Sequence, residues 1–206
     1  MVQVKICGIT NLEDALAALG AGADALGFNF YQGSPRFIEP EAARRIIERL
    51  PRRVLTVGVF VNEGGPEMVA RIADRARVEA VQLHGDETSD YCRALRERFV
   101  IKALRVTEDF VPESAARYEA DAVLLDAYAV ESRGGTGRVI DWQKARRTRE
   151  LVPKLFLAGG LAPENVAEAI RAVEPYAVDA CSRLESAPGR KDTSRVNAFI
   201  AAVKKK

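Results

Sequence analysis

The sequence contains very little histidine and cysteine for its length. Among its 206 residues there is one histidine, His84, and there are three cysteines, Cys7, Cys92 and Cys181. This scarcity excludes histidine-clustered metal sites and a framework of several disulfides. If the chain is an enzyme, its proton transfers must therefore rest mainly on side chains other than histidine.

The chain also lacks long apolar runs and an excess of charge of either sign. Its longest apolar runs, such as 55–61, are far shorter than the ~18–20 residues of a membrane helix, and no secretory signal is visible at the N-terminus. The 31 basic and 29 acidic residues leave a net charge of +2, without the basic block typical of nucleic-acid binding. We expect a soluble, cytoplasmic protein that binds neither nucleic acid nor a membrane and keeps its cysteines as thiols.

What the sequence does contain is a regular alternation of short apolar runs and helical patterns. The apolar runs are rich in Val, Ile, Leu and Phe and mostly continuous, which is typical of strands buried on both faces of a parallel sheet. The expected strands cover 3–8, 25–30, 54–61, 80–85, 99–106, 122–128, 154–160 and 176–182. The expected helices cover 11–21, 39–50, 66–76, 88–98, 112–119, 141–151, 163–173 and 192–204.

Eight strand–helix units without a linker predict one domain over residues 1–206. The physical options are an open doubly wound sheet and a closed barrel, and the count of eight units favours an α/β single-domain (β/α)8 TIM barrel. In such a barrel the active site lies at the C-terminal ends of the strands. Polar residues at those ends are therefore the candidates for chemistry.

Four polar residues at expected strand ends stand out. Cys7 ends the first strand on the same face as Lys5, whose charge favours a thiolate; buried packing is the alternative for a cysteine. Asp126 follows an apolar run, and its partial desolvation would suit it to hold and deliver a proton; an N-cap or a structural ion pair is the alternative. Asp179 has the same setting and the same alternatives. His84 ends the fourth expected strand, near the same C-terminal opening of the barrel. A structural role is the alternative for a lone histidine.

Glycines and an arginine complete the candidate site. Gly159 and Gly160 end the seventh expected strand before a helix, where backbone N–H groups can approach a phosphate. The loop 131–138 contains Gly135. It could serve as a lid or contact the phosphate, and the alternative is an ordinary surface turn. Arg36 follows the second strand and could hold a carboxylate with two hydrogen bonds, although most arginines are solvated.

Several of these segments together resemble one known family. KICGIT, ALGFNFYQGSPRFI, VGVFVN, QLHGDE, LLDAY, GGTGRVIDW, LAGGL and APGRKD are similar, in this order and along essentially the whole chain, to phosphoribosylanthranilate isomerase. This is a (β/α)8 enzyme of tryptophan synthesis. The resemblance implies an Amadori rearrangement of N-(5′-phosphoribosyl)anthranilate to 1-(o-carboxyphenylamino)-1-deoxyribulose 5-phosphate. It implies no metal and no organic cofactor.

The resemblance also carries roles onto matching residues. The cysteine of KICG is implied to be the general base and falls on Cys7, and the aspartate of LLDAY is implied to be the general acid and falls on Asp126. The arginine of the SPR loop, Arg36, is implied to hold the anthranilate carboxylate. The remaining expected substrate contacts are His84, Asp179, Gly159, Gly160, Ser182 and Gly135. The expected partner is thus a small phosphorylated molecule, bound by a monomer or homodimer.

One segment departs from the family pattern. After the eighth strand the family typically has a Ser-Ser-Gly-Val-Glu run that builds part of the phosphate site, whereas this chain has CSRLE at 181–185. Arg183 replaces a glycine and adopts positive φ less readily, so the local backbone is expected to differ. Arg183 could instead offer a cation to the phosphate.

Two other functions stay open at this point. One is a different phosphate-binding barrel such as indole-glycerol-phosphate synthase, although that chemistry uses lysine acids and a longer N-terminal extension. The other is a barrel that binds a phosphorylated ligand without converting it, which only the altered loop at 181–185 favours. The presence of Cys7 and Asp126 favours the isomerase.

Overall fold

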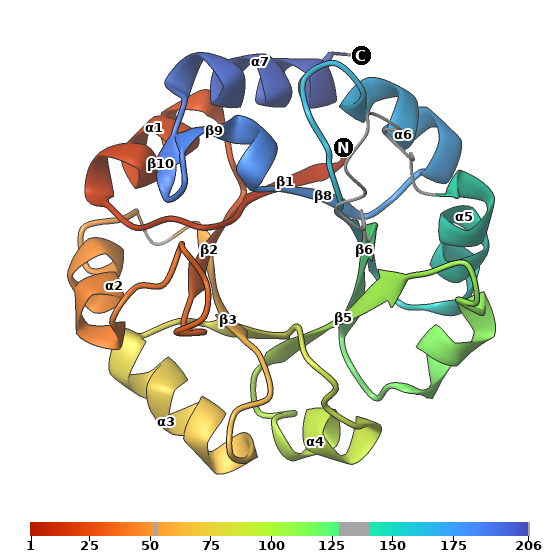
Figure 1. Cartoon of the computed structure of the whole chain (residues 1–206). Coiled ribbons are helices and arrows are strands. Elements are labelled where there is room, and N and C mark those ends of the chain that lie inside the picture. The colour runs from red at the N-terminus through yellow and green to blue at the C-terminus, as the bar shows by residue number, and fades with distance from the viewer. Residues whose placement is uncertain (52, 128–140, 206) are drawn as a thin grey trace.

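Eight parallel strands close into a barrel in the computed structural model, which describes residues 1–51, 53–127 and 141–205 (Figure 1). Each strand pairs with the next along the chain, and β1 pairs with β8 to close the ring. This confirms the expected (β/α)8 barrel and rules out the open sheet. The strands are β1 (Gln3–Ile6), β2 (Ala25–Asn29), β3 (Leu55–Phe60), β4 (Ala80–Leu83), β5 (Phe99–Val106), β6 (Ala122–Ala127), β7 (Leu155–Leu157) and β8 (Ala177–Ala180).

The helices form a ring around the barrel (Figure 1). The first begins as predicted after Asn11, whose side chain caps it by accepting a hydrogen bond from the N–H of Asp14. No helix in the described part of the chain is long and apolar enough to cross a membrane. The helices are α1 (Leu12–Ala21), α2 (Pro40–Ile47), α3 (Pro66–Ala76), α4 (Ser89–Ala94), the 3-10 helix η1 (Pro112–Arg117), α5 (Trp142–Leu151), α6 (Val166–Val173) and α7 (Thr193–Lys204).

Besides α2, which ends at Ile47 rather than at Leu50, three helices differ from the sequence-based expectation. The segment 112–119 forms the 3-10 helix η1 rather than an α-helix, and α4 is shorter than the expected 88–98. The last of the three, α6, begins at Val166 rather than at Pro163. The Asn165 side chain accepts a hydrogen bond from the N–H of Ala162 and donates one to the Gly160 carbonyl, so a turn is held in place before the helix starts.

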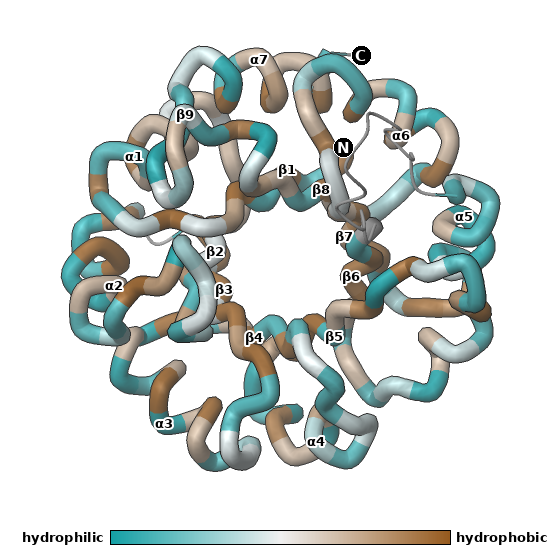
Figure 2. The backbone as a smooth tube through the Cα atoms, in the orientation of Figure 1, coloured by the Kyte–Doolittle hydropathy of each residue, from teal (hydrophilic) through white to brown (hydrophobic). Residues whose placement is uncertain are grey.

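Apolar residues form two layers, one between the strands and the helices and one inside the barrel. Successive side chains of a strand face opposite sides of the sheet, so each strand contributes to both layers. This explains why the strands are mostly apolar, whereas the outer helices alternate hydrophilic and hydrophobic stretches (Figure 2). The inner layer includes Ala25, Val57, Ala80, Ile101, Leu124, Phe156 and Ala177.

The connection between β8 and α7 contains a short hairpin that the sequence did not predict. A 3-10 turn, η2 (Ser182–Leu184), leads into antiparallel strands β9 (Glu185–Ala187) and β10 (Arg190–Lys191). The hairpin turns at Gly189, which has a φ of 77°. The backbone N–H of Lys191 donates to the Asp14 carboxylate at 2.9 Å, which ties the hairpin to α1.

Candidate active site

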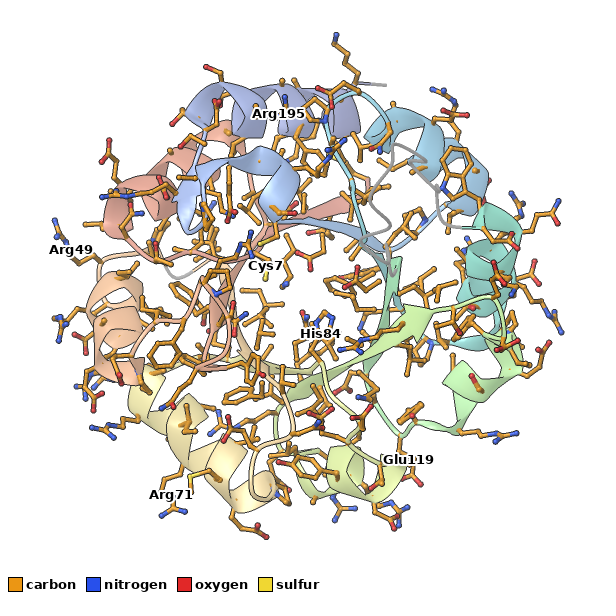
Figure 3. The ribbon with its side chains drawn as sticks, viewed as in Figure 1. Cys7, Arg49, Arg71, His84, Glu119 and Arg195 are labelled. Atoms are coloured by element: carbon orange, nitrogen blue, oxygen red, sulfur yellow. The ribbon has the colours of Figure 1, made fainter. Side chains whose placement is uncertain are left out.

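Polar side chains gather inside the barrel at the C-terminal ends of the strands. Lys5 of β1 is in register with Asp179 of β8, and Cys7, directly after β1, faces the same side as Lys5. Figure 3 shows Cys7 and His84 near the barrel axis, whereas Arg49, Arg71 and Glu119 lie at the outer rim. The structure therefore brings Cys7, His84, Asp126 and Asp179 to the same mouth, as the strand-end argument predicted.

Lys5 and Asp179 form a buried ion pair beneath the mouth. The Lys5 Nζ lies 3.0 Å from the Asp179 Oδ2, and the side chains are 0% and 7% exposed. Burial raises the pKa of Asp179 to about 7, with Lys5 opposing the rise and negative charge on Cys7 and Asp126 adding to it. Burial alone would lower the pKa of Lys5, but the charges of Asp179 and Cys7 outweigh it and raise the pKa. Lys5 therefore stays a cation beside Cys7.

Cys7 has the surroundings of a thiolate. A hydrogen bond from the Cys181 thiol is the main reason why the pKa of Cys7 lies well below the usual thiol value; burial opposes the shift, and the charges of Lys5 and Lys191 add to it. The same interaction raises the pKa of Cys181, so Cys7 is the anion of the pair, and the Cys181 thiol also donates to the Glu185 Oε1 at 3.9 Å. A Cβ at position 27 would lie 2.7 Å from the Cys7 Sγ, so glycine at that position makes room for the sulfur.

Gln82, His84 and Asp126 form a chain of hydrogen bonds across the mouth. The amide nitrogen of Gln82 lies 2.8 Å from His84 Nδ1, and His84 Nε2 lies 3.2 Å from Asp126 Oδ2. An amide N–H can only donate, so Nδ1 accepts and the Nε2–H points at the Asp126 carboxylate. The Asp126 side chain is 35% exposed, which is less desolvation than its apolar strand predicted. Hydrogen bonding from His84, more than burial, distinguishes its environment.

Arg36 already holds a carboxylate of this chain. Its guanidinium makes a two-pronged contact with Glu185 of β9, with Nε 2.9 Å from Oε1 and Nη2 2.7 Å from Oε2. The Lys191 Nζ lies 2.9 Å from the same Glu185 Oε1. Burial would raise the pKa of Glu185, but its hydrogen bonds to Arg36 and Lys191 keep the pKa low. The carboxylate-binding geometry predicted for Arg36 is thus present, directed at Glu185.

Sequence reasoning missed Glu185 and Lys191 as members of this cluster. Both side chains are almost completely buried, although each lies in a polar stretch of sequence. Strands of two and three residues produce no periodic pattern from which burial could be predicted. The only available signal was their position within the CSRLE and GRKD segments that follow the last barrel strand.

The two glycines predicted to contact phosphate both have positive φ. Gly159 has a φ of 86° and Gly160 a φ of 70°, conformations that favour glycine. Arg183 lies in η2 without positive φ, so its replacement of a glycine causes no backbone strain. Gly135 and the loop 131–138 lie outside the described residues. A neighbouring pocket of about 580 Å³ is lined by Ala162, Glu164, Asn165, Ser182, Arg183, Glu185 and Arg195.

Incomplete hydrogen bonding also marks the barrel interior. In the described part of the chain, the buried side-chain atoms without a hydrogen-bond partner are Gln82 Oε1 and Asp179 Oδ1. Both residues belong to the inner face of the barrel just below the mouth. Such groups cost ~1–3 kcal/mol each and require a specific explanation, such as a functional role.

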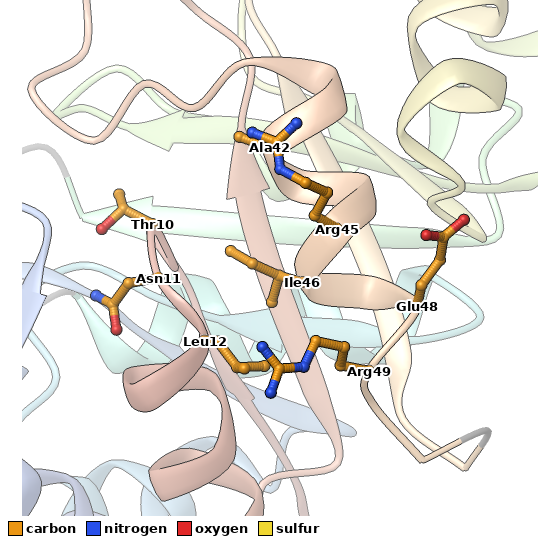
Figure 4. Close-up of a pocket in the computed structure, with 8 residues that line it drawn as sticks. All are labelled: Thr10, Asn11, Leu12, Ala42, Arg45, Ile46, Glu48 and Arg49. Atoms are coloured by element: carbon orange, nitrogen blue, oxygen red, sulfur yellow. The ribbon is translucent and has the colours of Figure 1, made fainter.

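A second surface pocket, of about 560 Å³, lies outside the barrel beside α1 and α2 (Figure 4). It contains none of the residues of the mouth, so size alone does not identify the site. Among the described residues, no group of three or more His, Cys, Asp or Glu side chains is placed to hold a metal ion. The third cysteine, Cys92, is buried in α4, and burial raises its pKa to about 11.

Comparison with known proteins agrees with this geometry. Residues 4–202 match the model of the N-(5′-phosphoribosyl)anthranilate (PRA) isomerase family. An N-(5′-phosphoribosyl)anthranilate isomerase of Trichlorobacter lovleyi is 54% identical over 99% of this chain and 98% of its own. The crystal structure of phosphoribosyl anthranilate isomerase from Thermotoga maritima has a TM-score of 0.92 at 48% identity and 99% coverage of both chains. A phosphoribosyl anthranilate isomerase crystallised with reduced 1-(o-carboxyphenylamino)-1-deoxyribulose 5-phosphate has a TM-score of 0.89 at 46% identity, again with 99% coverage of both chains.

Proposed function

The chain belongs to the phosphoribosylanthranilate isomerase family of tryptophan biosynthesis, and we propose that it divides the proton transfers of that isomerisation between Cys7 as general base and Asp126 as general acid. The observation that carries the proposal is the environment of Cys7. A thiol whose pKa is lowered by Cys181, Lys5 and Lys191 is ready to accept a proton at neutral pH.

Two side chains perform the first two proton transfers of the proposed reaction. Asp126 donates a proton to the furanose ring oxygen of N-(5′-phosphoribosyl)anthranilate, and the ring opens to an iminium. The Cys7 thiolate then removes the proton from C2′, and the resulting enolamine tautomerises to the ketone of 1-(o-carboxyphenylamino)-1-deoxyribulose 5-phosphate. The steps assigned to Asp126 and Cys7 are both acid–base steps.

His84 supports the acid rather than replacing it. Its Nε2–H points at Asp126 Oδ2, so it stabilises the carboxylate that forms when Asp126 gives up its proton. Gln82 fixes this tautomer through His84 Nδ1. Both residues are therefore positioning residues in the proposed mechanism.

The substrate contacts follow from the same mouth. Backbone N–H groups of Gly159, Gly160 and the segment at Ser182 lie on the loops after β7 and β8, the usual phosphate site of such barrels. Arg36 has the two-pronged geometry that suits the anthranilate carboxylate, which would share the guanidinium with Glu185. Asp179 and His84 line the floor between these two ends. A monomer or homodimer stays the predicted state, and sedimentation of the purified protein tests it.

Replacing the proposed base and acid tests the assignment. Cys7→Ser and Asp126→Asn should each lower kcat by ~10²–10⁴-fold, the usual contribution of a general acid or base, in a protein that stays folded. Cys92→Ala is the matched control, because Cys92 is buried in α4 away from the mouth. The assay follows loss of the fluorescent anthranilate adduct. Turnover close to that of the wild type in either of the first two variants would refute the role of that residue.

A further inference from the structure

Cys7 and Cys181 lie side by side where β1 meets β8. Ile6 is in register with Ala180, and the Cys7 N–H donates to the Ala180 carbonyl at 2.9 Å, so Cys181 occupies the next position across from Cys7. Paired strands lie about 4.7–4.9 Å apart, within the ~4.4–6.8 Å between Cα atoms that a disulfide spans. Each of the two thiols also shifts the pKa of the other, as groups that lie close together do.

Glycines give both sulfurs space, and the mouth gives them access. A Cβ on Gly27 would lie 2.7 Å from the Cys7 Sγ, and one on Gly8 would lie 2.9 Å from the Cys181 Sγ. Cys7 is 9% exposed and Cys181 is half-buried, whereas Cys92 is completely buried. A small oxidant can therefore reach the pair but not Cys92.

We propose that Cys7 and Cys181 form a reversible oxidation site, at which hydrogen peroxide or a similar small peroxide converts the two thiols to a disulfide. The Cys7 sulfur attacks the peroxide: an S–O bond forms, the O–O bond breaks, and a sulfenic acid and hydroxide result. Cys181 then gives up its proton and attacks the Cys7 sulfur. An S–S bond forms, the S–O bond breaks, and the departing hydroxide takes that proton and leaves as water. The two sulfurs together lose two electrons, which reduce the peroxide.

The charges around Cys181 fit this order of events. As long as Cys7 is an anion, the hydrogen bond and the repulsion between the two groups keep the pKa of Cys181 high. A neutral sulfenic acid at Cys7 removes both effects. The Glu185 Oε1 lies 3.9 Å from the Cys181 Sγ and opposes ionisation of that thiol, but it is itself paired with Arg36 and Lys191. These two cations, of which the Lys191 Nζ lies 3.9 Å from the Cys181 Sγ, favour the Cys181 thiolate. Cys181 thus becomes a nucleophile after Cys7 has been oxidised.

Two consequences follow for the protein. The disulfide shields Cys7 from further oxidation to the irreversible sulfinic acid. It also removes the general base, so that turnover stops until a thiol reductant restores it. This second consequence rests on the proposed function of Cys7, whereas formation of the bond does not.

Peroxide treatment of the reduced protein tests the proposal, with Cys181→Ser and Cys92→Ala as variants. In the wild type, two of the three thiols should disappear. A non-reducing peptide map should show the Cys7 and Cys181 peptides joined with the loss of two hydrogens, and dithiothreitol should restore both thiols and activity. Cys92→Ala should form the same link. In Cys181→Ser under excess peroxide, Cys7 should proceed to sulfinic acid, and dithiothreitol should recover little of that variant's own starting activity.

Several outcomes would overturn the proposal. They are an unlinked Cys7 sulfinic acid in the oxidised wild type, a link that involves Cys92, and a recovery in Cys181→Ser equal to that of the wild type. Joined Cys7 and Cys181 peptides with undiminished turnover would support the disulfide and contradict the role of Cys7 as base.

Discussion

Two buried lysine–carboxylate pairs in this barrel have the same chemistry and very different surroundings. Lys5–Asp179 lies inside the barrel with a 3.0 Å contact, and Lys102–Glu87 lies outside it, between β5 and the loop that leads to α4, with a 2.7 Å contact. All four side chains are almost completely removed from solvent. Burial alone therefore does not distinguish the two pairs.

The outer pair is fully satisfied. The Lys102 Nζ donates to Glu87 and to the carbonyls of Leu83 and Gly85. Glu87 in turn accepts hydrogen bonds from the backbone N–H groups of Gly85 and Asn62. Burial would raise the pKa of Glu87, but these contacts, led by Lys102, keep it low. One cation and one anion balance each other, which is the pattern of a structural ion pair.

The inner pair has one cation for two possible anions. Lys5 contacts Asp179 and also stabilises the thiolate of Cys7, and Asp179 Oδ1 has no partner among the described residues. The pKa of Asp179 is therefore raised to about 7 while that of Cys7 is lowered. The comparison teaches that an imbalance of charges beside a nucleophile, rather than burial, marks the functional pair.

Removing the outer lysine should give the largest effect, on stability. Lys102→Met leaves Glu87 buried without its cation and should lower the free energy of unfolding by ~3–5 kcal/mol. The kcat of the folded fraction should stay close to that of the wild type, because Lys102 lies outside the barrel. Urea denaturation and steady-state kinetics measure the two quantities. A large loss of kcat in fully folded Lys102→Met would contradict the distinction between the structural and the functional pair.

Removing the inner lysine should lower the free energy of unfolding less than removing the outer one, and should lower kcat more. In Lys5→Met both Asp179 and Cys7 can become neutral, so the free energy of unfolding should fall by only ~1–3 kcal/mol. The Cys7 thiolate loses its nearest cation, so kcat at neutral pH should fall by about 10²-fold. The same two measurements apply. A kcat equal to that of Lys102→Met would contradict the account.

The two carboxylates should also give stability opposite dependences on pH. Between its ordinary value of 3.8 and about 7, Asp179 is protonated in the folded state and ionised in the unfolded state, so its contribution to stability falls as pH rises. The pKa of Glu87 is lowered on folding, so its contribution is present above 4.5 and is lost as pH falls through the folded value. Free energies of unfolding of wild type, Asp179→Asn and Glu87→Gln across this range would show both slopes. The contrary result would be that the difference in unfolding free energy between wild type and variant changes with pH in the same way for Asp179→Asn and for Glu87→Gln.

The smallest effect should come from the hydrogen-bond chain beside the inner pair. Gln82→Met removes the donor to His84 Nδ1 and should lower kcat about threefold to tenfold, the value of one hydrogen bond. It also removes the unpartnered Oε1, so the free energy of unfolding should stay equal or rise. Kinetics and thermal denaturation test both parts. A marked loss of stability with unchanged kcat would show that Gln82 serves packing alone.

The barrel itself could be predicted because each strand is buried on both faces and each is followed by a helical pattern. The strand-end residues Cys7, Asp126 and Asp179 could be predicted for the same reason, since alternation along a strand fixes which side chains face the axis. The start of α6 could not, because the Asn165 side chain decides it through bonds to two neighbouring backbone groups.

The charge network at the mouth was beyond prediction for a different reason. Arg36 meets Glu185 across 149 residues of sequence, and the hairpin that brings Glu185 into place has strands of only three and two residues. The hydrogen bond between Cys7 and Cys181 likewise depends on the closure of β1 against β8. Such contacts exist only once the barrel has closed.

Cys7 is expected to be a thiolate that Lys5 helps to sustain, together with Cys181 and Lys191. The most direct test is the rate at which iodoacetamide alkylates Cys7, measured by peptide mass analysis as a function of pH in wild type, Lys5→Met and Lys102→Met. In wild type and Lys102→Met, alkylation should persist well below the pH at which an ordinary thiol ionises, and in Lys5→Met the profile should move to higher pH. Superimposable profiles for wild type and Lys5→Met, or an ordinary thiol profile in the wild type, would contradict the account.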